Sequence, residues 1–558
     1  MVSQEGLVIN TCLLFRSDLK PISLIVFNLL LAIWLGVFLN IAFFEKIRML
    51  TPYNGVKAGL FVVASIIIVV AAYNFIFQFF NWKWTAKPLA IALVFIGGFA
   101  AYAVNTLGVL ITSDQIQNLM QTDIAEARDT WSWYLLTWTL GMTVVPIIVI
   151  LMMKIKPEPI IRQLFHKVIA SVVSLAMVLG LLFVFYVDFA SIFRTNRDLK
   201  GMISPQNMIA SFASYYKKKA PKENLPLVVY GEDAVLQKAQ ATSLPKLMVL
   251  VVGETARAEN FSLNGYGKNT NPKLSQQDIL NFSQVSSCGT ATAVSVPCMF
   301  SGMPRKEYEE RLAIHREGLL DIAQRAGYQV TWIDNNSGCK GTCDRVNQFK
   351  IPEPLQQKWC KDKECFDDIL IDSFKAYLAT IPQDDNRPRL IVLHQMGSHG
   401  PAYYKRVPAQ FKVFKPTCDT NAIQGCSREA LLNSYDNTLL YTDYVLDTLI
   451  ETLKNTTKYQ SALWYLSDHG ESTGEHGMYL HGAPYAIAPK QQTHIPMVMW
   501  FSDAWKNMAS PQIHCLAEQG SATLSQDNLF PSMLSLLDIQ TYVIDQNINM
   551  LKKCSLRS

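Results

Sequence analysis

Five long apolar segments in the first 188 residues constrain this chain more than any other feature of its sequence. They lie at about residues 21–44, 58–80, 88–112, 131–153 and 167–187. Each reaches the roughly 20 residues that a helix needs to cross a bilayer. We therefore predict an α-helical membrane domain of five transmembrane helices. A chain of 558 residues also exceeds what one hydrophobic core usually organises, so a second, water-soluble domain is expected.

The loops between these segments differ in charge, and the difference predicts the topology. The loop at 154–167 is basic, whereas the loop at 113–130 is acidic. By the positive-inside rule the first loop is cytoplasmic and the second is external. The mildly basic loop at 45–57 argues weakly for the opposite orientation. We predict a cytoplasmic N-terminus and, because the number of spans is odd, an extracytoplasmic C-terminal domain.

Ten of the eleven cysteines follow residue 280, and most of them lie in close pairs. An even number of clustered cysteines is typical of disulfides made in an oxidising compartment, which agrees with the predicted topology. A cysteine-rich metal site is the alternative, but the regular C-x-x-C spacing of zinc ribbons is absent. The expected pairs are Cys288–Cys298, Cys339–Cys343, Cys360–Cys365, Cys418–Cys426 and Cys515–Cys554.

The segment after the last apolar run has the composition of a connection between two domains. Apolar residues recur at helical spacing from Met208 to Tyr216, and lysines follow. This pattern fits an interfacial helix on the outer leaflet or an ordinary packing helix with a solvated basic end. The net charge of +5 is modest and does not indicate a nucleic-acid partner. We predict a transmembrane domain at 1–187, an interfacial helix and linker at 188–245, and a soluble domain at 246–558.

Short apolar runs rich in β-branched residues alternate with helical stretches from Lys246 onward. They lie at 247–253, 328–333, 390–393, 462–466 and 495–501. Continuous apolar strands between helices are typical of an α/β domain whose central sheet is mostly parallel and covered on both faces. In such sheets the functional site lies at the carboxyl ends of the strands.

Carboxylates and imidazoles follow three of these runs. They are Glu254 after the first, His394 and His399 after the third, and Asp468, His469 and Glu471 after the fourth, with His481 further on. A lone histidine at a strand end is more often a capping or core residue. Convergence of all these groups on one sheet edge instead predicts a metal site, and mixed carboxylate and imidazole ligands suit zinc or manganese better than calcium.

The stretch 288–298 offers three hydroxyl groups, those of Thr290, Thr292 and Ser295. A hydroxyl at the start of a helix lies in the positive field of the helix dipole, and a nearby dication can hold it as an alkoxide. The same three residues could instead only cap a helix. Spacing alone does not choose among them.

Several segments together give the chain a resemblance to a known family. They are V-V-G-E-T-A-R, S-C-G-T-A-T-A-V-S-V-P-C-M-F-S, D-N-N-S-G-C-K-G, L-H-Q-M-G-S-H-G-P-A-Y, S-Y-D-N-T-L-L-Y-T-D and S-D-H-G-E-S-T-G-E-H-G-M-Y-L-H-G. With these segments the chain resembles the lipid A phosphoethanolamine transferases, which include the mobile colistin-resistance enzymes and their chromosomal relatives. The resemblance implies a soluble domain with the fold of the alkaline phosphatases and sulfatases.

The resemblance also implies roles for individual residues. Glu254, Thr292, Asp468 and His469 would bind one tightly held zinc ion, and Thr292 would be the nucleophile. A further set would contact the substrate phosphate or a second, weaker zinc. This set is Asn336, Lys340, His394, His399, Glu471 and His481. The bridge of Cys339 to Cys343 is absent from some mobile members of the family.

The implied reaction moves phosphoethanolamine from phosphatidylethanolamine to a lipid A phosphate through a covalent phosphoethanolamine-threonine. The implied location is the bacterial inner membrane, with a monomer whose catalytic domain is periplasmic, and the implied outcome is resistance to polymyxin and colistin. One alternative is a phosphoglycerol transferase of the same superfamily, and another is a non-catalytic membrane sensor that binds lipid or metal. A sulfatase is disfavoured, because Cys288 and Cys298 do not match a formylglycine signature.

Overall fold

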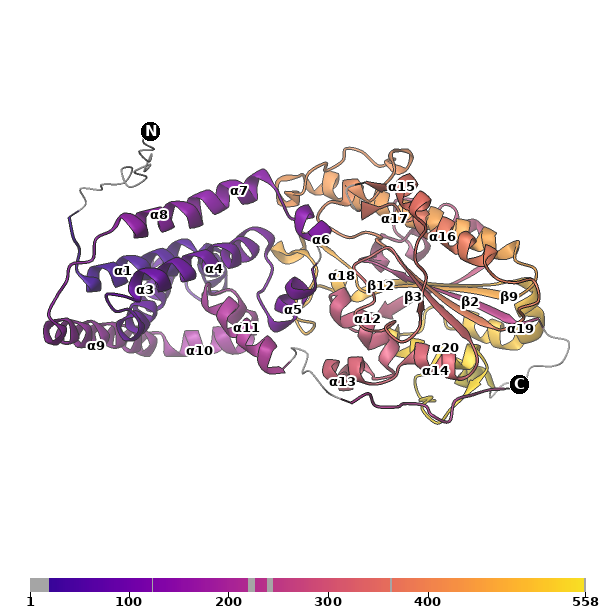
Figure 1. The fold of residues 1–558 in the computed structure, drawn as a ribbon. Coiled ribbons are helices and arrows are strands. Elements are labelled where there is room, and N and C mark those ends of the chain that lie inside the picture. The colour runs from indigo at the N-terminus through magenta and orange to yellow at the C-terminus, as the bar shows by residue number, and fades with distance from the viewer. Residues whose placement is uncertain (1–19, 123, 219–225, 238–243, 362–363, 556–558) are drawn as a thin grey trace, which may run out of the picture. The chain divides into compact units, whose positions relative to one another are not determined.

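The computed structural model describes residues 20–122, 124–218, 226–237, 244–361 and 364–555 (Figure 1). It divides into two compact units. The helical unit contains Met1–Ile111 and Trp133–Ser211. The second unit, named the catalytic unit after the activity expected from the sequence, contains Thr112–Ser132 and Phe212–Ser558. The segment at 112–132, between the third and fourth apolar segments, therefore belongs to the catalytic unit by its contacts. The sequence prediction had assigned this segment to the transmembrane domain.

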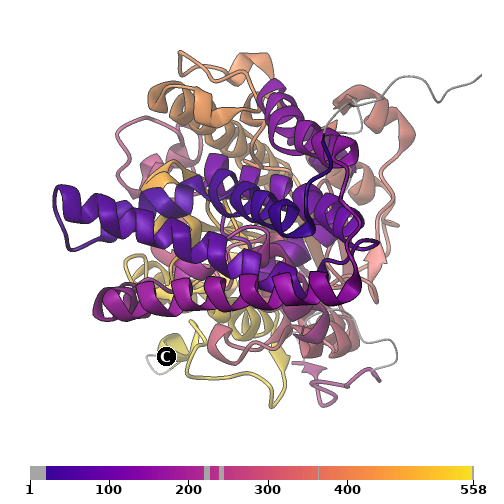
Figure 2. The same cartoon turned by 90° about the vertical axis from the view of Figure 1, so that its left-hand side faces the viewer.

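Among the residues that the structure describes, four helices are long and apolar enough to cross a membrane. They are α3 (Val56–Phe80), α4 (Ala86–Leu107), the stretch Trp133–Met152 that includes α7 (Trp133–Thr139) and α8 (Val145–Met152), and α9 (Ile160–Val184). Figure 2 shows the helices of this unit facing the viewer. A helix pair, Leu24–Phe38 and Ile41–Leu50, adds a fifth apolar stretch that is bent by 60°. These four or five apolar helices agree with the predicted membrane domain.

The break in the first apolar stretch has a cause in the sequence. The side-chain amide of Asn40 is buried and donates hydrogen bonds to the carbonyls of Leu35 (2.8 Å) and Gly36 (3.4 Å). At a bend, some carbonyls of the helix lose their main-chain N–H donors. The Asn40 amide supplies donors to two of these carbonyls, so the apolar helix can bend without leaving them unpaired in lipid.

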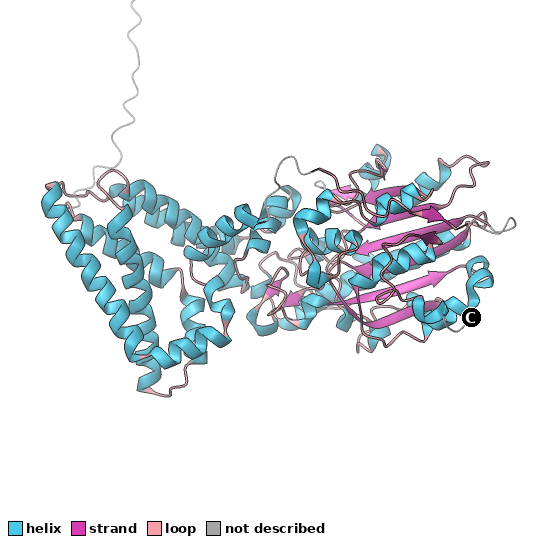
Figure 3. Cartoon of the chain, turned by 90° about the horizontal axis from the view of Figure 1, so that it is seen from below, coloured by secondary structure: helices cyan, strands magenta, loops and turns pink. Residues whose placement is uncertain are grey.

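The catalytic unit is built on one eight-stranded sheet (Figure 3, magenta). The strand order is β13 (Leu524–Ser525), β3 (Ile279–Ser286), β12 (His494–Phe501), β9 (Gln460–Ser467), β2 (Lys246–Gly253), β8 (Arg389–His394), β4 (Gln329–Asp334) and β5 (Asn347–Gln348). Strand β12 runs antiparallel to both of its neighbours, and the other neighbouring pairs are parallel. The mostly parallel sheet predicted from the sequence is confirmed.

Side chains that alternate along β2 enter two separate cores. Met248, Leu250 and Val252 pack on one face with α12 (Thr292–Ser301), α14 (Leu319–Arg325), α19 (Asp503–Ala517) and α20 (Leu529–Leu536). Leu247, Val249 and Val251 pack on the other face with α16 (Asp368–Ala379) and α17 (Arg428–Lys454). Because successive strand residues point to opposite faces, a continuous apolar run is what a sheet covered on both sides requires.

Five disulfides lie in the catalytic unit. They join the pairs expected from the sequence: Cys288–Cys298, Cys339–Cys343, Cys360–Cys365, Cys418–Cys426 and Cys515–Cys554. The first of them joins two cysteines that are ten positions apart and closes the loop that contains Thr292. These cysteines therefore offer no thiolates to a metal ion.

Candidate active site

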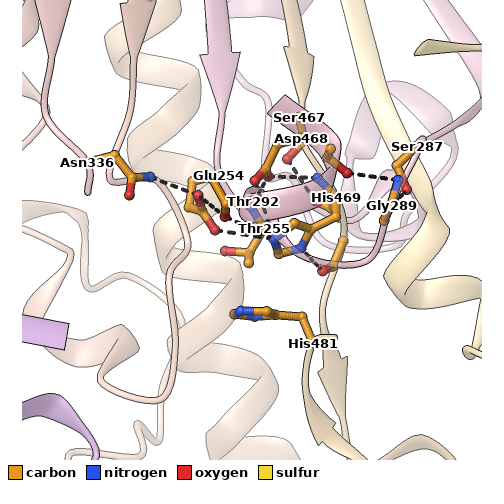
Figure 4. Close-up of polar contacts among 12 residues, drawn as sticks. Glu254, Thr255, Ser287, Gly289, Thr292, Asn336, Ser467, Asp468, His469 and His481 are labelled. Carbon is orange, nitrogen blue, oxygen red and sulfur yellow. Dashed lines mark hydrogen bonds and ion pairs between the residues drawn. The ribbon is translucent and has the colours of Figure 1, made fainter. Parts of the chain in front are cut away.

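Two neighbouring parallel strands bring three potential metal ligands together. Gly253 at the end of β2 is in register with Ser467 at the end of β9. Glu254 follows the first strand, and Asp468 and His469 follow the second. All three side chains are at most 1% exposed, and one ligand atom from each lies within 4.8 Å of the others. Figure 4 shows the three side chains pointing toward one another.

Thr292 is the hydroxyl that faces this cluster. It is the first residue of α12, and its Oγ1 donates to Glu254 Oε2 (3.0 Å) and lies 3.3 Å from His469 Nε2. The other two candidate hydroxyls have structural partners: Thr290 Oγ1 donates to the carbonyl of Ala483 (2.7 Å), and Ser295 Oγ accepts the N–H of Gly289 (2.9 Å). The structure thus distinguishes Thr292, whose hydroxyl contacts the cluster, from Thr290 and Ser295, whose hydroxyls bind the backbone. The spacing in the sequence could not make this distinction.

The imidazole of His469 is neutral rather than cationic. Its Nδ1 lies 2.8 Å from the carbonyl of Gly470, which fixes the proton on that nitrogen. Burial lowers the pKa of His469 to about 4, so the ring is neutral at pH 7. Its Nε2 lies 3.3 Å from Asp468 Oδ2 and 3.6 Å from Glu254 Oε1.

The residues fit a bound cation. Within the described part of the chain, Asp468 Oδ2 is buried and has no hydrogen-bond donor. A buried carboxylate oxygen without a donor is costly, and a cation between it and His469 removes that cost. Two carboxylates, a neutral imidazole and a hydroxyl form the nitrogen and oxygen donor set that Zn²⁺ accepts at four-coordinate sites. Among the described residues, the two other groups with the residue types of a metal site contain disulfide-bonded cysteines.

A second group of polar side chains lies beside the first. The ring of His481 is 4.5 Å from that of His469 and 5.6 Å from that of His399, measured between centroids. His481 Nδ1 is 3.5 Å from Glu471 Oε1, and the side chain of Glu471 is fully buried. Three of the residues predicted for substrate or a second metal are therefore grouped together.

Comparisons with known proteins place these features in a family. Residues 246–539 match the sulfatase family, and residues 68–220 match the phosphoethanolamine transferase EptA/EptB family. The phosphoethanolamine transferase EptA of Salmonella typhimurium is 42% identical over 94% of this chain and 96% of its own length. The chain belongs to the phosphoethanolamine transferase family. The phosphatidylethanolamine transferase Mcr-1 of Escherichia coli is 32% identical over 95% of this chain and 97% of its own length.

A solved structure extends the family likeness to the whole fold. The integral membrane lipooligosaccharide phosphoethanolamine transferase A of Neisseria meningitidis superposes with a TM-score of 0.91 at 37% identity. The match covers 96% of this chain and 99% of that one. The family resemblance inferred from the sequence motifs is confirmed, as is the membrane domain joined to an alkaline phosphatase-like domain.

Asn336 in this phosphoethanolamine transferase donates a hydrogen bond to Glu254, one of the three residues of the cluster. Its side-chain amide donates to Glu254 Oε2 (2.8 Å) and to the carbonyl of Gln395 (2.8 Å). The amide therefore orients the Glu254 carboxylate.

The backbone of Gly397 also lies against Glu254. With φ of +51°, it passes so close that a Cβ at this position would lie 2.7 Å from the carbonyl oxygen of Glu254. Only glycine fits that approach without a shift.

Two predicted residues bind elsewhere. Lys340 Nζ donates to the carbonyl (3.0 Å) and the hydroxyl (2.8 Å) of Ser337 within its own loop. The buried ring of His394 pairs through Nδ1 with Asp334 Oδ1 (2.8 Å). The hydrogen bonds of both side chains thus lie outside the Glu254–Asp468–His469 cluster.

The segment at 112–132 contributes contacts that the sequence analysis missed. Helix α5 (Ser113–Gln121) presents Gln115, whose Nε2 donates to the carbonyl of His481 (2.9 Å), and Gln117, whose Nε2 donates to the carbonyl of Ala293 (3.4 Å). Ala293 is the neighbour of Thr292. In the sequence this segment stands out by its acidic composition, which predicts its side of the membrane and gives no indication of contacts with the active site.

Proposed function

We propose that this enzyme transfers phosphoethanolamine from phosphatidylethanolamine to a phosphate of lipid A through a covalent phosphoethanolamine-Thr292 intermediate. The observation that carries the proposal is the position of Thr292 Oγ1, 3.0 Å from Glu254 and 3.3 Å from His469 at the start of α12. Names of relatives support the two lipids: one is a phosphatidylethanolamine transferase, and another, 26% identical, is a Kdo(2)-lipid A phosphoethanolamine 7''-transferase.

Zinc is the proposed cofactor, held by Glu254, Thr292, Asp468 and His469. When bound, it supplies the positive charge that lowers the pKa of a threonine hydroxyl and polarises a phosphodiester. The chain itself supplies three further contributions. Glu254 accepts the hydrogen bond of the Thr292 hydroxyl, the N-terminus of α12 favours negative charge on Oγ1, and Asn336 keeps Glu254 in place.

In the first half-reaction Thr292 Oγ1 attacks the phosphorus of the donor. The bond from Oγ1 to phosphorus forms, the bond from phosphorus to the glycerol oxygen breaks, and diacylglycerol leaves with a proton. In the second half-reaction an oxygen of the acceptor phosphate attacks the same phosphorus and returns the electron pair to Oγ1. His399 and His481 are the candidates for proton donation and for binding the phosphate oxygens, and together with Glu471 they would hold a weaker second zinc if one binds.

The cellular setting follows from this chemistry. The proposed enzyme is a monomer of the bacterial inner membrane, with a cytoplasmic N-terminus and a periplasmic catalytic unit. Each transfer adds an ammonium group to an anionic lipid, so the outer surface becomes less negative. Cationic peptides such as polymyxin and colistin then bind less strongly.

Replacement of the nucleophile tests the proposal. Full-length wild-type protein incubated with phosphatidylethanolamine is expected to gain the mass of one phosphoethanolamine, and Thr292→Ala is expected to gain none. Thr292→Ser retains a hydroxyl and serves as the matched control that should still form the adduct. A phosphoethanolamine adduct that persists on Thr292→Ala would refute the assignment. Mass spectrometry of lipid A from expressing cells then tests the acceptor.

A further inference from the structure

Two adjoining pockets extend from the Asn336 side of the active site. The first, of about 300 Å³, is lined by Asn336, which contacts Glu254, and by His399. The second has a volume of about 420 Å³. Both are lined by Glu364, Cys365 and Arg406, so they lie next to each other. A molecule that occupies both would reach from the catalytic edge of the sheet to the second pocket.

The second pocket is rich in cationic and aromatic side chains. Its cationic lining residues are Arg128, Lys361, Lys405, Arg406 and Lys412, and its carboxylates are Asp129 and Glu364. Trp359, Phe366 and Tyr404 add aromatic faces. Lysine and arginine bind phosphate oxygens, and aromatic rings provide apolar surface for the ring of a sugar. The lining therefore has the chemistry of a site for a phosphorylated sugar.

The two carboxylates are already engaged by two of the cations. Asp129 accepts from Lys405 Nζ (2.5 Å) and pairs with Arg406, whose Nη1 is 3.0 Å from Glu364 Oε2. Within the described residues Lys361 and Lys412 form no ion pair, although Lys412 lies 5.8 Å from the ring of Tyr404. The pocket therefore retains uncompensated positive charge.

This charge suits the acceptor better than the donor. Phosphatidylethanolamine carries a single phosphate, and that group must lie at Thr292 to react. A glycolipid acceptor with two phosphates leaves one of them unreacted. Arg406 also connects the pocket to the His399–Glu471–His481 group, because its Nε donates to the carbonyl of His399 (3.0 Å).

We propose that the second pocket binds the non-reacting phosphorylated sugar of the acceptor while its other phosphate reaches Thr292. This inference rests on the proposed transfer to a glycolipid phosphate. Lys361 and Lys412 bind the distant phosphate, and the aromatic residues contact the sugar. The pocket therefore determines the choice of acceptor and takes no part in the formation of the Thr292 adduct.

The test compares two acceptors with the full-length enzyme in detergent micelles. A fluorescent phosphatidylethanolamine is the donor, and lipid A with two phosphates or with one phosphate is the acceptor. The Lys361→Ala/Lys412→Ala double variant is expected to raise the KM for the doubly phosphorylated acceptor about tenfold, as expected for the loss of two charge-assisted contacts. Its KM for the singly phosphorylated acceptor and its release of diacylglycerol without acceptor should remain at wild-type values.

Two matched variants serve as controls. Lys361→Arg/Lys412→Arg keeps the charges and should retain most of the preference for two phosphates. Lys454→Ala removes the last residue of α17, which lines neither pocket, and should change neither KM. An equal loss with both acceptors, or slower release of diacylglycerol by the double variant, would overturn the proposal. If the wild-type enzyme itself forms no adduct, the proposed function fails instead.

Discussion

Asn336 provides a quantitative test of how the proposed metal ligand Glu254 is held in place. Its amide donates to Glu254 Oε2 at 2.8 Å, and Asn336→Ala removes that bond and leaves the buried carboxylate oxygen without this donor. A hydrogen bond to a charged group contributes about 1.5–3 kcal/mol. With 1.4 kcal/mol for each factor of ten, the expected loss of zinc affinity is about 10-fold to 100-fold.

The assay is zinc competition against a fluorescent chelator, with metal-stripped full-length protein. Asn335→Ala is the matched control, because the neighbouring amide of Asn335 donates to Asp367 Oδ1 (2.8 Å) and to the carbonyl of Cys365, and not to Glu254. The control should lower thermal stability without a change in zinc affinity. Unchanged zinc affinity in Asn336→Ala, together with a raised KM for the donor, would refute the orienting role and favour direct contact with substrate.

Two further predictions concern the stability of the catalytic unit. Because burial lowers the pKa of His469 from 6.5 to about 4, the unfolded chain binds more protons between these values. The free energy of unfolding of metal-free protein should therefore fall by up to about 3 kcal/mol as pH drops from 6.5 to 4, and a His469→Gln variant that lost as much in denaturant titrations would contradict this cause. Asp129→Asn breaks a buried ion pair with Arg406 and should cost about 3–5 kcal/mol. Faster hydrogen exchange across 112–132 is the expected readout, and exchange at the wild-type rate would show that the pair does not hold this segment.

Much of the catalytic unit could be predicted from the sequence because its central strands are buried on both faces. Five of the eight strands appear as continuous apolar runs. Strand β3, with the sequence ILNFSQVS, was missed because polar residues interrupt it and most of its side chains are only partly buried. Strand β12 was predicted, but its apolar sequence does not indicate that it runs antiparallel to both neighbours.

The candidate site shows a similar division. Glu254, Asp468 and His469 directly follow strands β2 and β9. Because these strands are parallel neighbours, their carboxyl ends lie side by side whatever path the connecting helices take. The contacts of Lys340 and Asn336 depend on the path of one loop, and no periodicity in the sequence encodes that path. The resemblance implied that both residues contact the substrate phosphate or a second zinc. In the structure Asn336 binds Glu254, whereas Lys340 binds Ser337.

The contacts of Gln115 and Gln117 also bear on the order in which the enzyme is made. Gln117 precedes its partner Ala293 by 176 residues, and apolar helices flank its segment on both sides. During synthesis the helices on each side of this segment leave the ribosome well before the proposed metal ligands Asp468 and His469. Gln115 and Gln117 are therefore made before the carbonyls of His481 and Ala293 that they bind. A fragment that begins at residue 246 would keep Glu254, Asp468, His469 and Thr292, but the carbonyls of His481 and Ala293 would face water in place of these glutamines.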